Sequence, residues 1–136
     1  MSVLRVELVS PERVAYSGEA KMVIARTIEG DIAFLPGHVP FIGVLDTHQV
    51  RVLLEAGGEQ MIAVHQGFVE VSPAEETGDT KVTILSDVCE LADDIDVARA
   101  NLAKNRAEEK LKLDHENAAA HAALQRAEVR LTVAGD

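Results

Sequence analysis

Basic side chains recur at helical spacing near the C-terminal end of the chain, in a pattern that could bind a polyphosphate. Asp96 and Arg99 are three residues apart and can pair on one turn of a helix, and Arg106 shares a face with Arg99. Arg126 and Arg130 are four residues apart on a second predicted helix. If the helices are antiparallel, Arg130 lies beside Arg99, and converging guanidinium groups near free backbone amides can bind phosphate. A solvated, salt-bridged helix surface is the simpler interpretation from the residues alone.

Other sequence patterns typical of catalysis or metal binding are absent. There is no phosphate-binding glycine-rich loop, no Gly-x-Ser-x-Gly and no His-Glu-x-x-His. The five histidines share no ligand-like spacing, and no pair of carboxylates stands out as an acid–base couple. His38, between Gly37 and Pro40, is interpreted as a corner residue bonded to the backbone. We therefore predict no catalytic residue, no metal site and a protein that is not an enzyme.

Composition narrows the classes of partner. The net charge of −10 and the aromatic content of 3% argue against a nucleic-acid partner. Cys89 is the single cysteine and is predicted to be a small buried hydrophobic residue. No stretch approaches the roughly 18 apolar residues of a membrane span, and no signal or transit peptide is visible. We expect a protein that reaches a membrane only when another protein holds it there.

The elements that position the arginines fall into two parts, residues 1–88 and residues 89–136. In the first, short apolar or alternating runs are separated by Gly, Pro and polar turns, which is typical of an antiparallel β-sandwich of about ten strands. Strands are expected over residues 3–9, 13–16, 21–26, 32–35, 49–55, 60–65, 67–71 and 81–85. Turns are expected at Ser17-Gly18, Gly30-Asp31 and Gly57-Gly58, with a polar loop over residues 73–79.

The chain between residues 29 and 44 is expected to cross from one sheet of the sandwich to the other. Two prolines interrupt it, and Pro40 removes a backbone donor, so a continuous ladder is not favoured here. Phe41, Ile42 and Val44 are apolar. They predict that the crossover packs against the core.

From Asp93 onward the chain is rich in alanine, has no proline, and is predicted to be helical. Helices are expected over Ile95 to Leu113 and, after a cap at Asp114 or Asn117, to about Val133, in an antiparallel hairpin. The facing sides carry mostly alanine, and a buried methyl contributes roughly 0.8 kcal/mol against about 1.5–3 kcal/mol for a buried Leu or Ile. Either the hairpin detaches from the sandwich, or it is an ordinary cap on a β domain.

The run GDIAFLPGHVPFIGVL, residues 30–45, resembles the signature of the epsilon subunit of bacterial F-type ATP synthases. Further pieces agree in order and spacing: Val9-Ser10-Pro11-Glu12-Arg13, Gly67-Phe68-Val69-Glu70-Val71, Val82-Thr83-Ile84-Leu85 and Ile95-Asp96-Val97-Ala98-Arg99-Ala100. The resemblance covers nearly the whole chain. It implies a ten-stranded sandwich followed by a helical hairpin.

The resemblance also implies a role and partners. It implies a non-catalytic rotor subunit that joins the gamma subunit to the membrane c-ring, peripheral on the cytoplasmic face of a bacterial cell membrane. The turn of Glu29, Gly30 and Asp31 would meet the c-ring, with His38 nearby. The hairpin would fold against the sandwich or extend toward the catalytic alpha and beta subunits and suppress ATP hydrolysis.

In some members of that family the folded hairpin binds ATP through the motif Ile/Leu-Asp-x-x-Arg-Ala. Here the motif is Ile95-Asp96-Val97-Ala98-Arg99-Ala100, and by the same resemblance Glu90, Arg106 and Arg130 would complete the pocket. The break between the helices is shorter than in many ATP-binding members, which could move Arg130 out of reach. ATP is thus expected as a regulatory ligand, with no required cofactor.

A free-standing nucleotide sensor, with a sandwich and a helical lid, is the alternative. The turn at Asp31 separates the two hypotheses. A sensor should tolerate charge reversal there, whereas in a rotor subunit Asp31→Lys should weaken coupling.

Overall fold

The computed structural model describes residues 3–74 and 77–135, which form ten strands, one short 3-10 helix and two α-helices. The strands are β1 (Leu4–Val9), β2 (Val14–Ala20), β3 (Met22–Thr27), β4 (Gly30–Phe34), β5 (Phe41–Leu45), β6 (His48–Leu53), β7 (Glu59–Val64), β8 (Gly67–Ala74), β9 (Asp79–Leu85) and β10 (Cys89–Leu91). The helices are η1 (Ala92–Asp94), α1 (Val97–Leu113) and α2 (Ala118–Ala134). The predicted fold class, a β-sandwich followed by a helical hairpin, is confirmed.

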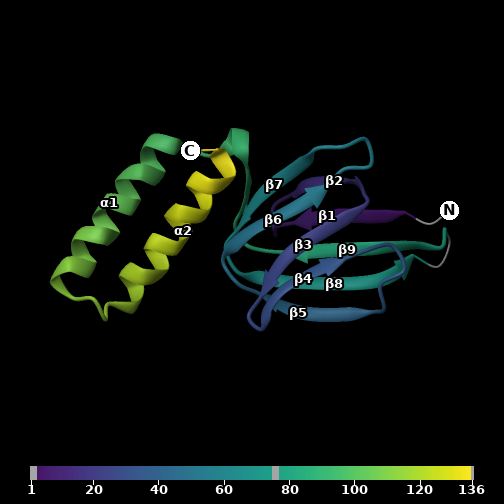
Figure 1. The fold of residues 1–136 in the computed structure, drawn as a ribbon, viewed down its shortest axis with the longest axis horizontal. Helices are drawn as coiled ribbons and strands as arrows, with labels where there is room; N and C mark the ends of the chain where they lie inside the picture. Colours follow the sequence, from purple (N-terminus) through teal and green to yellow (C-terminus); the bar gives the residue numbers. More distant parts are fainter. Residues whose placement is uncertain (1–2, 75–76, 136) are drawn as a thin grey trace.

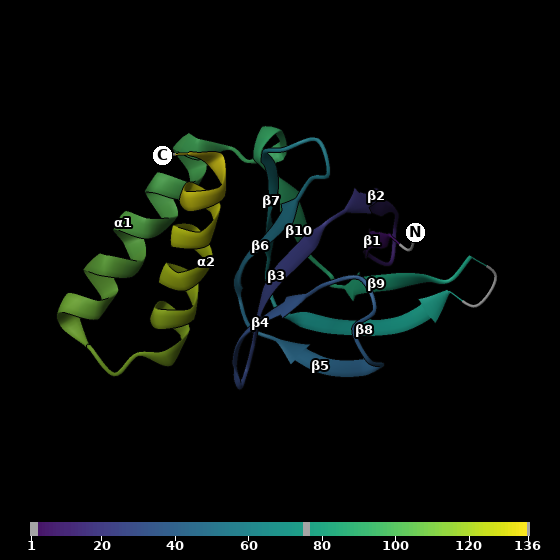
Figure 2. The same cartoon turned by 45° about the vertical axis from the view of Figure 1, so that its right-hand side comes forward.

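The strands form one continuous sheet that curves back over itself into two layers (Figures 1 and 2). Its order is β10-β7-β6-β3-β5-β8-β9-β1-β2, with β4 paired to β3 outside this path. Neighbouring strands are antiparallel except β1 and β9, which are parallel. β10 pairs with β7, so the sheet continues three residues beyond the division expected at residue 88.

The core between the layers is aliphatic apart from Phe34. Its largest fully buried side chains are Phe34, Leu4, Leu8, Leu45, Ile62 and Ile84, followed by six valines. Cys89 is 6% exposed at the end of this cluster, and burial raises the pKa of its thiol. The prediction of a small buried hydrophobic cysteine is confirmed.

Several local predictions are wrong, for one reason: the strands run further than their apolar residues indicate. Ser17-Gly18 lies inside β2, and Gly30-Asp31 begins β4, so the turn falls at Ile28-Glu29. Residues 73 and 74 belong to β8 and Asp79 to β9, so the predicted polar loop is shorter; its residues 75 and 76 lie outside the described part of the chain. In each case backbone pairing with a neighbouring strand continues through residues that are not typical of strands: Ser17-Gly18, Gly30-Asp31 and Pro73-Ala74.

The crossover prediction is wrong for two of its three apolar residues. Phe41 packs against the core, but Ile42 is 73% exposed and Val44 41% exposed. Residues 41–45 form a strand, in which successive side chains point to opposite faces. Gly43 and Leu45 therefore share the inner face with Phe41, and the other two side chains point outward.

A buried carboxylate joins the starts of β1 and β9. Asp79 accepts hydrogen bonds from the Val3 backbone N–H at 3.0 Å and from Arg5 Nε at 2.8 Å. These bonds, the one from Val3 first, lower the pKa of Asp79 from 3.8 to about 2. Because the folded-state pKa is the lower one, this carboxylate stabilises the fold above about pH 4, and its contribution is lost as the pH falls toward 2.

Asp79→Asn should therefore lower the melting temperature by several degrees at pH 7. The difference from the wild type should shrink between pH 4 and pH 2, because protonation then removes the same charge from the wild type. Thermal unfolding followed by circular dichroism at a series of pH values measures this. Asp87→Asn, at an exposed aspartate, is the matched control. A difference that does not change with pH would contradict the assignment.

The hairpin begins at a capped helix and ends at a glycine. Asp96 caps α1 by accepting from the Arg99 N–H at 3.0 Å, so the helix starts two residues later than expected. Asn117 caps α2, accepting from the Ala120 N–H at 3.0 Å, and Gly135 closes it in the left-handed conformation. In the described residues, neither helix is long and apolar enough to cross a membrane.

The hairpin rests on the sandwich through α2, which lies between α1 and the sheet (Figures 1 and 2). Val129 and Val133 pack with Ala63 and Ile95 in a small cluster separate from the main core. A fully buried Val or Ile side chain contributes about 1.5–3 kcal/mol, so this contact is weak beside the core. The sandwich core contains no residue of α1 or α2 among those described.

Candidate functional site

A cavity of about 230 Å³ lies where the start of α1 meets the end of α2 and β10. It is lined by Glu90, Asp94, Asp96, Arg99, Ala100, Ala103 and Arg130. The Asp96 carboxylate is occupied as the helix cap. Arg99 forms no ion pair with any residue in the described part of the chain. The cavity therefore offers a guanidinium that is available to an anion.

Glu90 is the centre of the polar contacts at this cavity. Its Oε1 accepts from Arg130 Nε at 2.8 Å and from His65 Nε2 at 2.9 Å. The bond from His65, and after it the bond from Arg130, lower the pKa of Glu90 in spite of its burial. Glu90 is thus ionised at neutral pH and joins β10 to α2.

A second cavity, of about 360 Å³, lies further along the hairpin between the two helices. It is lined by Ala103, Arg106, Ala107, Lys110, Asn117, Ala119, Ala120, Ala123 and Arg126. Ala103 lines both cavities, so they are adjacent. Two arginines and a lysine converge on the second one, and the described acids form no ion pair with them.

The structure brings together most, but not all, of the residues expected at a nucleotide pocket. Glu90, Asp96, Arg99, Ala100 and Arg130 share the first cavity, so the short interhelical break does not carry Arg130 away. Arg106 lies at the second cavity instead, and Ile95 is buried against the sandwich in the α2 contact.

Sequence reasoning missed Asp94, Ala103 and His65. Asp94 and Ala103 lie next to the motif and one turn along α1, so helical spacing could have found them. His65 is 25 residues from Glu90. Its contact depends on the pairing of β10 with β7, which no local pattern reveals.

The residues expected on the c-ring side are split between two places. Glu29, at the β3–β4 turn, and Asp31, at the start of β4, are both exposed. Arg26 Nε donates to Asp31 Oδ1 at 2.8 Å and lowers the pKa of that carboxyl. His38 follows the opposite end of β4; its ring packs edge-on against Phe34, and Nδ1 lies 2.7 Å from the Val39 carbonyl. The strand between them keeps His38 away from the turn.

Four exposed apolar side chains and half-buried Val9 form a row across the outer surface of the sheet. Val44 pairs with Phe68, Phe68 with Leu85, Leu85 with Val9, and Val9 with Val14. Apart from half-buried Val9, these are exposed, by 41% to 55%, and Ile42 adjoins the row at 73%. We call Val14, Ile42, Val44, Phe68 and Leu85 the outer apolar face. Adjacent exposed apolar side chains of this kind are typical of interaction sites.

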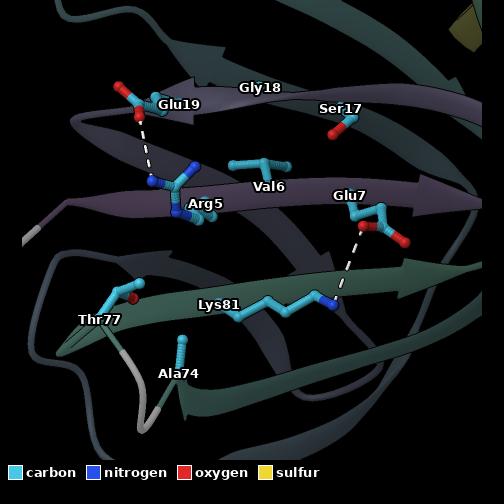
Figure 3. A pocket seen from close by; sticks show the side chains of 9 residues that line it. All are labelled: Arg5, Val6, Glu7, Ser17, Gly18, Glu19, Ala74, Thr77 and Lys81. Carbon is cyan, nitrogen blue, oxygen red and sulfur yellow. Dashed lines mark ion pairs between the residues drawn. The ribbon is translucent and has the colours of Figure 1, made fainter.

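A larger hollow, of about 660 Å³, lies on the outside of β1, β2 and β9 (Figure 3). Its charged side chains are already paired: Arg5 with Glu19 at 3.4 Å and with Asp79 at 2.8 Å, and Lys81 with Glu7 at 3.9 Å. It thus presents no unpaired charge to a ligand. Within residues 3–74 and 77–135, no group of three or more His, Cys, Asp or Glu side chains is arranged to hold a metal ion.

Comparison with known proteins agrees with this architecture. Residues 3–92 match the family described as ATP synthase, Delta/Epsilon chain, beta-sandwich domain, and residues 93–135 match its long alpha-helix domain. The ATP synthase epsilon chain of Brevibacillus brevis is 50% identical over 111 residues, 82% of this chain and 80% of that protein. The epsilon chain of Streptomyces griseus is 44% identical over 128 residues, 94% of this chain and 92% of that protein.

A solved structure shows the same fold. It is a chain in the Euglena gracilis mitochondrial ATP synthase, OSCP/F1/c-ring in rotational state 1, with a TM-score of 0.68 and 20% identity, covering 99% of this chain and 79% of that one. Both family domains, the length of the matches and the identity to bacterial relatives agree. The chain belongs to the ATP synthase delta/epsilon chain family, among the bacterial epsilon chains.

Proposed function

We propose that this epsilon chain is a non-catalytic coupling and regulatory subunit in the central stalk of a rotary proton-translocating ATP synthase. The observation that carries the proposal is the unequal packing of its two parts. The sandwich has a complete core of its own, whereas the hairpin is held to it by one small cluster and a few polar contacts. Such a body can stay attached while the hairpin moves.

The outer apolar face supports attachment of the sandwich to the gamma subunit. It spans β2, β5, β8 and β9, whose opposite faces carry core residues, so its exposed side chains add nothing to the core. The acidic turn at Glu29 and Asp31 lies in a different region, at the β3–β4 connection, and suits the polar loops of the c-ring. Two separate contact surfaces are what a coupling subunit needs.

The hairpin would act as the regulatory part. Among the described residues, α2 makes polar side-chain bonds to the sandwich region through Gln125, which donates to the Thr47 carbonyl at 2.9 Å, and through Arg130, which donates to Glu90. Because these contacts and the Val129–Val133 cluster stabilise the docked state only modestly, an extended state that reaches the alpha and beta subunits is accessible. In the extended state the hairpin would block rotation and inhibit ATP hydrolysis.

ATP would favour the docked state by binding the two adjacent cavities together. The first alone is smaller than the roughly 300–1,000 Å³ of ordinary ligand pockets, whereas the pair falls within that range. Arg99 and Arg130 line one cavity, and Arg106 and Arg126 line the other. Arginine forks suit phosphate oxygens, and both helices supply them only when they lie side by side.

Removal of residues 93–136 from the assembled ATP synthase tests the regulatory part. We expect ATP hydrolysis to rise severalfold while ATP synthesis continues, because β10 ends before the cut and the main core keeps all its residues. ATPase and synthesis rates of membrane vesicles measure this. Unchanged hydrolysis would refute the inhibitory role but not the coupling role. The coupling role has its own test, because Asp31→Lys should then reduce ATP synthesis. By the same proposal, the subunit lies peripherally on the cytoplasmic face of a bacterial membrane.

A further inference from the structure

A buried histidine joins the sandwich to the contact between β10 and α2. His65 lies between β7 and β8, and its side chain is 4% exposed. Its Nε2 is 2.9 Å from Glu90 Oε1, the same oxygen that accepts from Arg130 Nε at 2.8 Å. One carboxylate oxygen thus connects a loop of the sandwich, β10 and the last turns of α2.

The second ring nitrogen of His65 indicates that the contact with Glu90 is the reason for a histidine at this position. Nδ1 is buried and has no hydrogen-bond partner among the described residues. An ionised carboxylate only accepts hydrogen bonds, so His65 donates through Nε2, and Nδ1 is left without a partner. An unpaired buried polar atom is unfavourable, and an apolar residue would avoid it. The bond to Glu90 is the one polar contact of this imidazole that offsets that cost.

Glu90 has a choice of cationic partners. Arg99 and Arg130 both line its cavity, and Arg99 forms no ion pair within residues 3–74 and 77–135. A glutamate side chain has several rotatable bonds, so the carboxylate needs a second contact to hold one position. His65, approaching from the sandwich side, supplies that contact.

We propose that His65 is a positioning residue that holds the Glu90 carboxylate against Arg130, and so favours the docked hairpin while leaving Arg99 free for an anion. The inference rests on the proposed docked and extended states of the hairpin. His65 belongs to the sandwich, outside the hairpin and its motif, and it would shift the equilibrium between the docked and extended states. His65 acts through Glu90, because each of the two side chains bonds Glu90 Oε1 and no hydrogen bond joins His65 to Arg130 among the described residues.

Pulsed electron paramagnetic resonance on the full chain tests the proposal, with spin labels at Glu55→Cys and Asn105→Cys, both exposed sites. Cys89 is buried and its thiolate is disfavoured, so labelling is selective. We expect His65→Leu to lower the ratio of short to long distances about tenfold, the size of one hydrogen bond to a charged group. His65→Gln, which keeps an N–H donor, should restore most of the docked population.

The background variant Glu90→Ala, which removes the oxygen that accepts from His65, separates positioning from packing. If His65 acts through Glu90, His65→Leu should have almost no further effect there. If His65→Leu lowered the ratio of short to long distances tenfold in both the wild-type and the Glu90→Ala backgrounds, or in neither, the proposal would be overturned.

A hairpin that stays docked even in Arg130→Gln would refute the mobile hairpin of the proposed function rather than the role of His65. That role is then tested by the free energies of unfolding in urea of His65→Leu, Arg130→Gln and the double variant. These two side chains do not bond to each other, so non-additive effects would support a link through Glu90, and additive effects would exclude it.

Discussion

Phe68→Asp should weaken binding of this chain to the gamma subunit by about 100-fold or more. Phe68 lies in the middle of the outer apolar face, paired with Val44 on one side and Leu85 on the other, and is 54% exposed. Central aromatic residues of an interface typically account for 2 kcal/mol or more, and a carboxylate would in addition be buried without a partner. Each 1.4 kcal/mol is about tenfold in affinity.

The effect should be on binding and not on folding. Because Phe68 points away from the core, the melting temperature of the free variant should stay close to that of the wild type. Surface plasmon resonance with immobilised gamma subunit measures the affinity. Leu85→Asp and Leu113→Asp form a matched pair, since both place the same charge at an exposed leucine but only Leu85 belongs to the face. Equal affinity of that pair would rule out this surface as the gamma contact.

Arg99→Ala should reduce ATP binding by about 30- to 100-fold, or below detection. A hydrogen bond to a charged group contributes about 1.5–3 kcal/mol when a partner is removed, and Arg99 is the guanidinium at the first cavity that is free of an ion pair with described residues. Titration calorimetry of the full chain with ATP measures this. Arg51→Ala, which removes an arginine that is paired with Glu59 and lines neither cavity, is the matched control.

Arg106→Ala decides whether the two cavities form one site. A nucleotide that spans both should lose affinity in Arg106→Ala as well as in Arg99→Ala, whereas a ligand confined to the first cavity should lose affinity only in the latter. If millimolar ATP does not bind the wild type, the arginines have structural roles or meet the catalytic subunits. Regulation would then depend on the extended hairpin alone.

The sequence was sufficient for the architecture because the two halves of the chain differ in local physical preference. Alternating apolar residues between Gly and Pro turns favour strands, and an alanine-rich stretch without proline favours helices. Asn117 was one of the two predicted caps of the second helix for the same reason, since a cap depends on a side chain and an amide three residues away. The family signature was likewise a local pattern.

Local pattern did not decide which side of a strand is buried. Alternation in β5 groups Ile42 with Val44 and Phe41 with Leu45, but either group could have faced the core. The outer apolar face exists because β2, β5, β8 and β9, from distant parts of the chain, align their outward residues, with Val9 of β1 between Val14 and Leu85. β10 was missed because three residues are too few to show alternation.

The candidate site divides in the same way. The spacing of Asp96, Arg99 and Ala100 on one helix is a property of the sequence, and so is the return of Arg130 along an antiparallel hairpin. Only the tertiary structure placed Arg106 at a separate cavity, since that depends on how closely the alanine faces approach. The contact of His65 with Glu90 depends on the pairing of β10 with β7. Contacts between residues far apart in sequence are set by packing of the whole chain, which no local preference encodes.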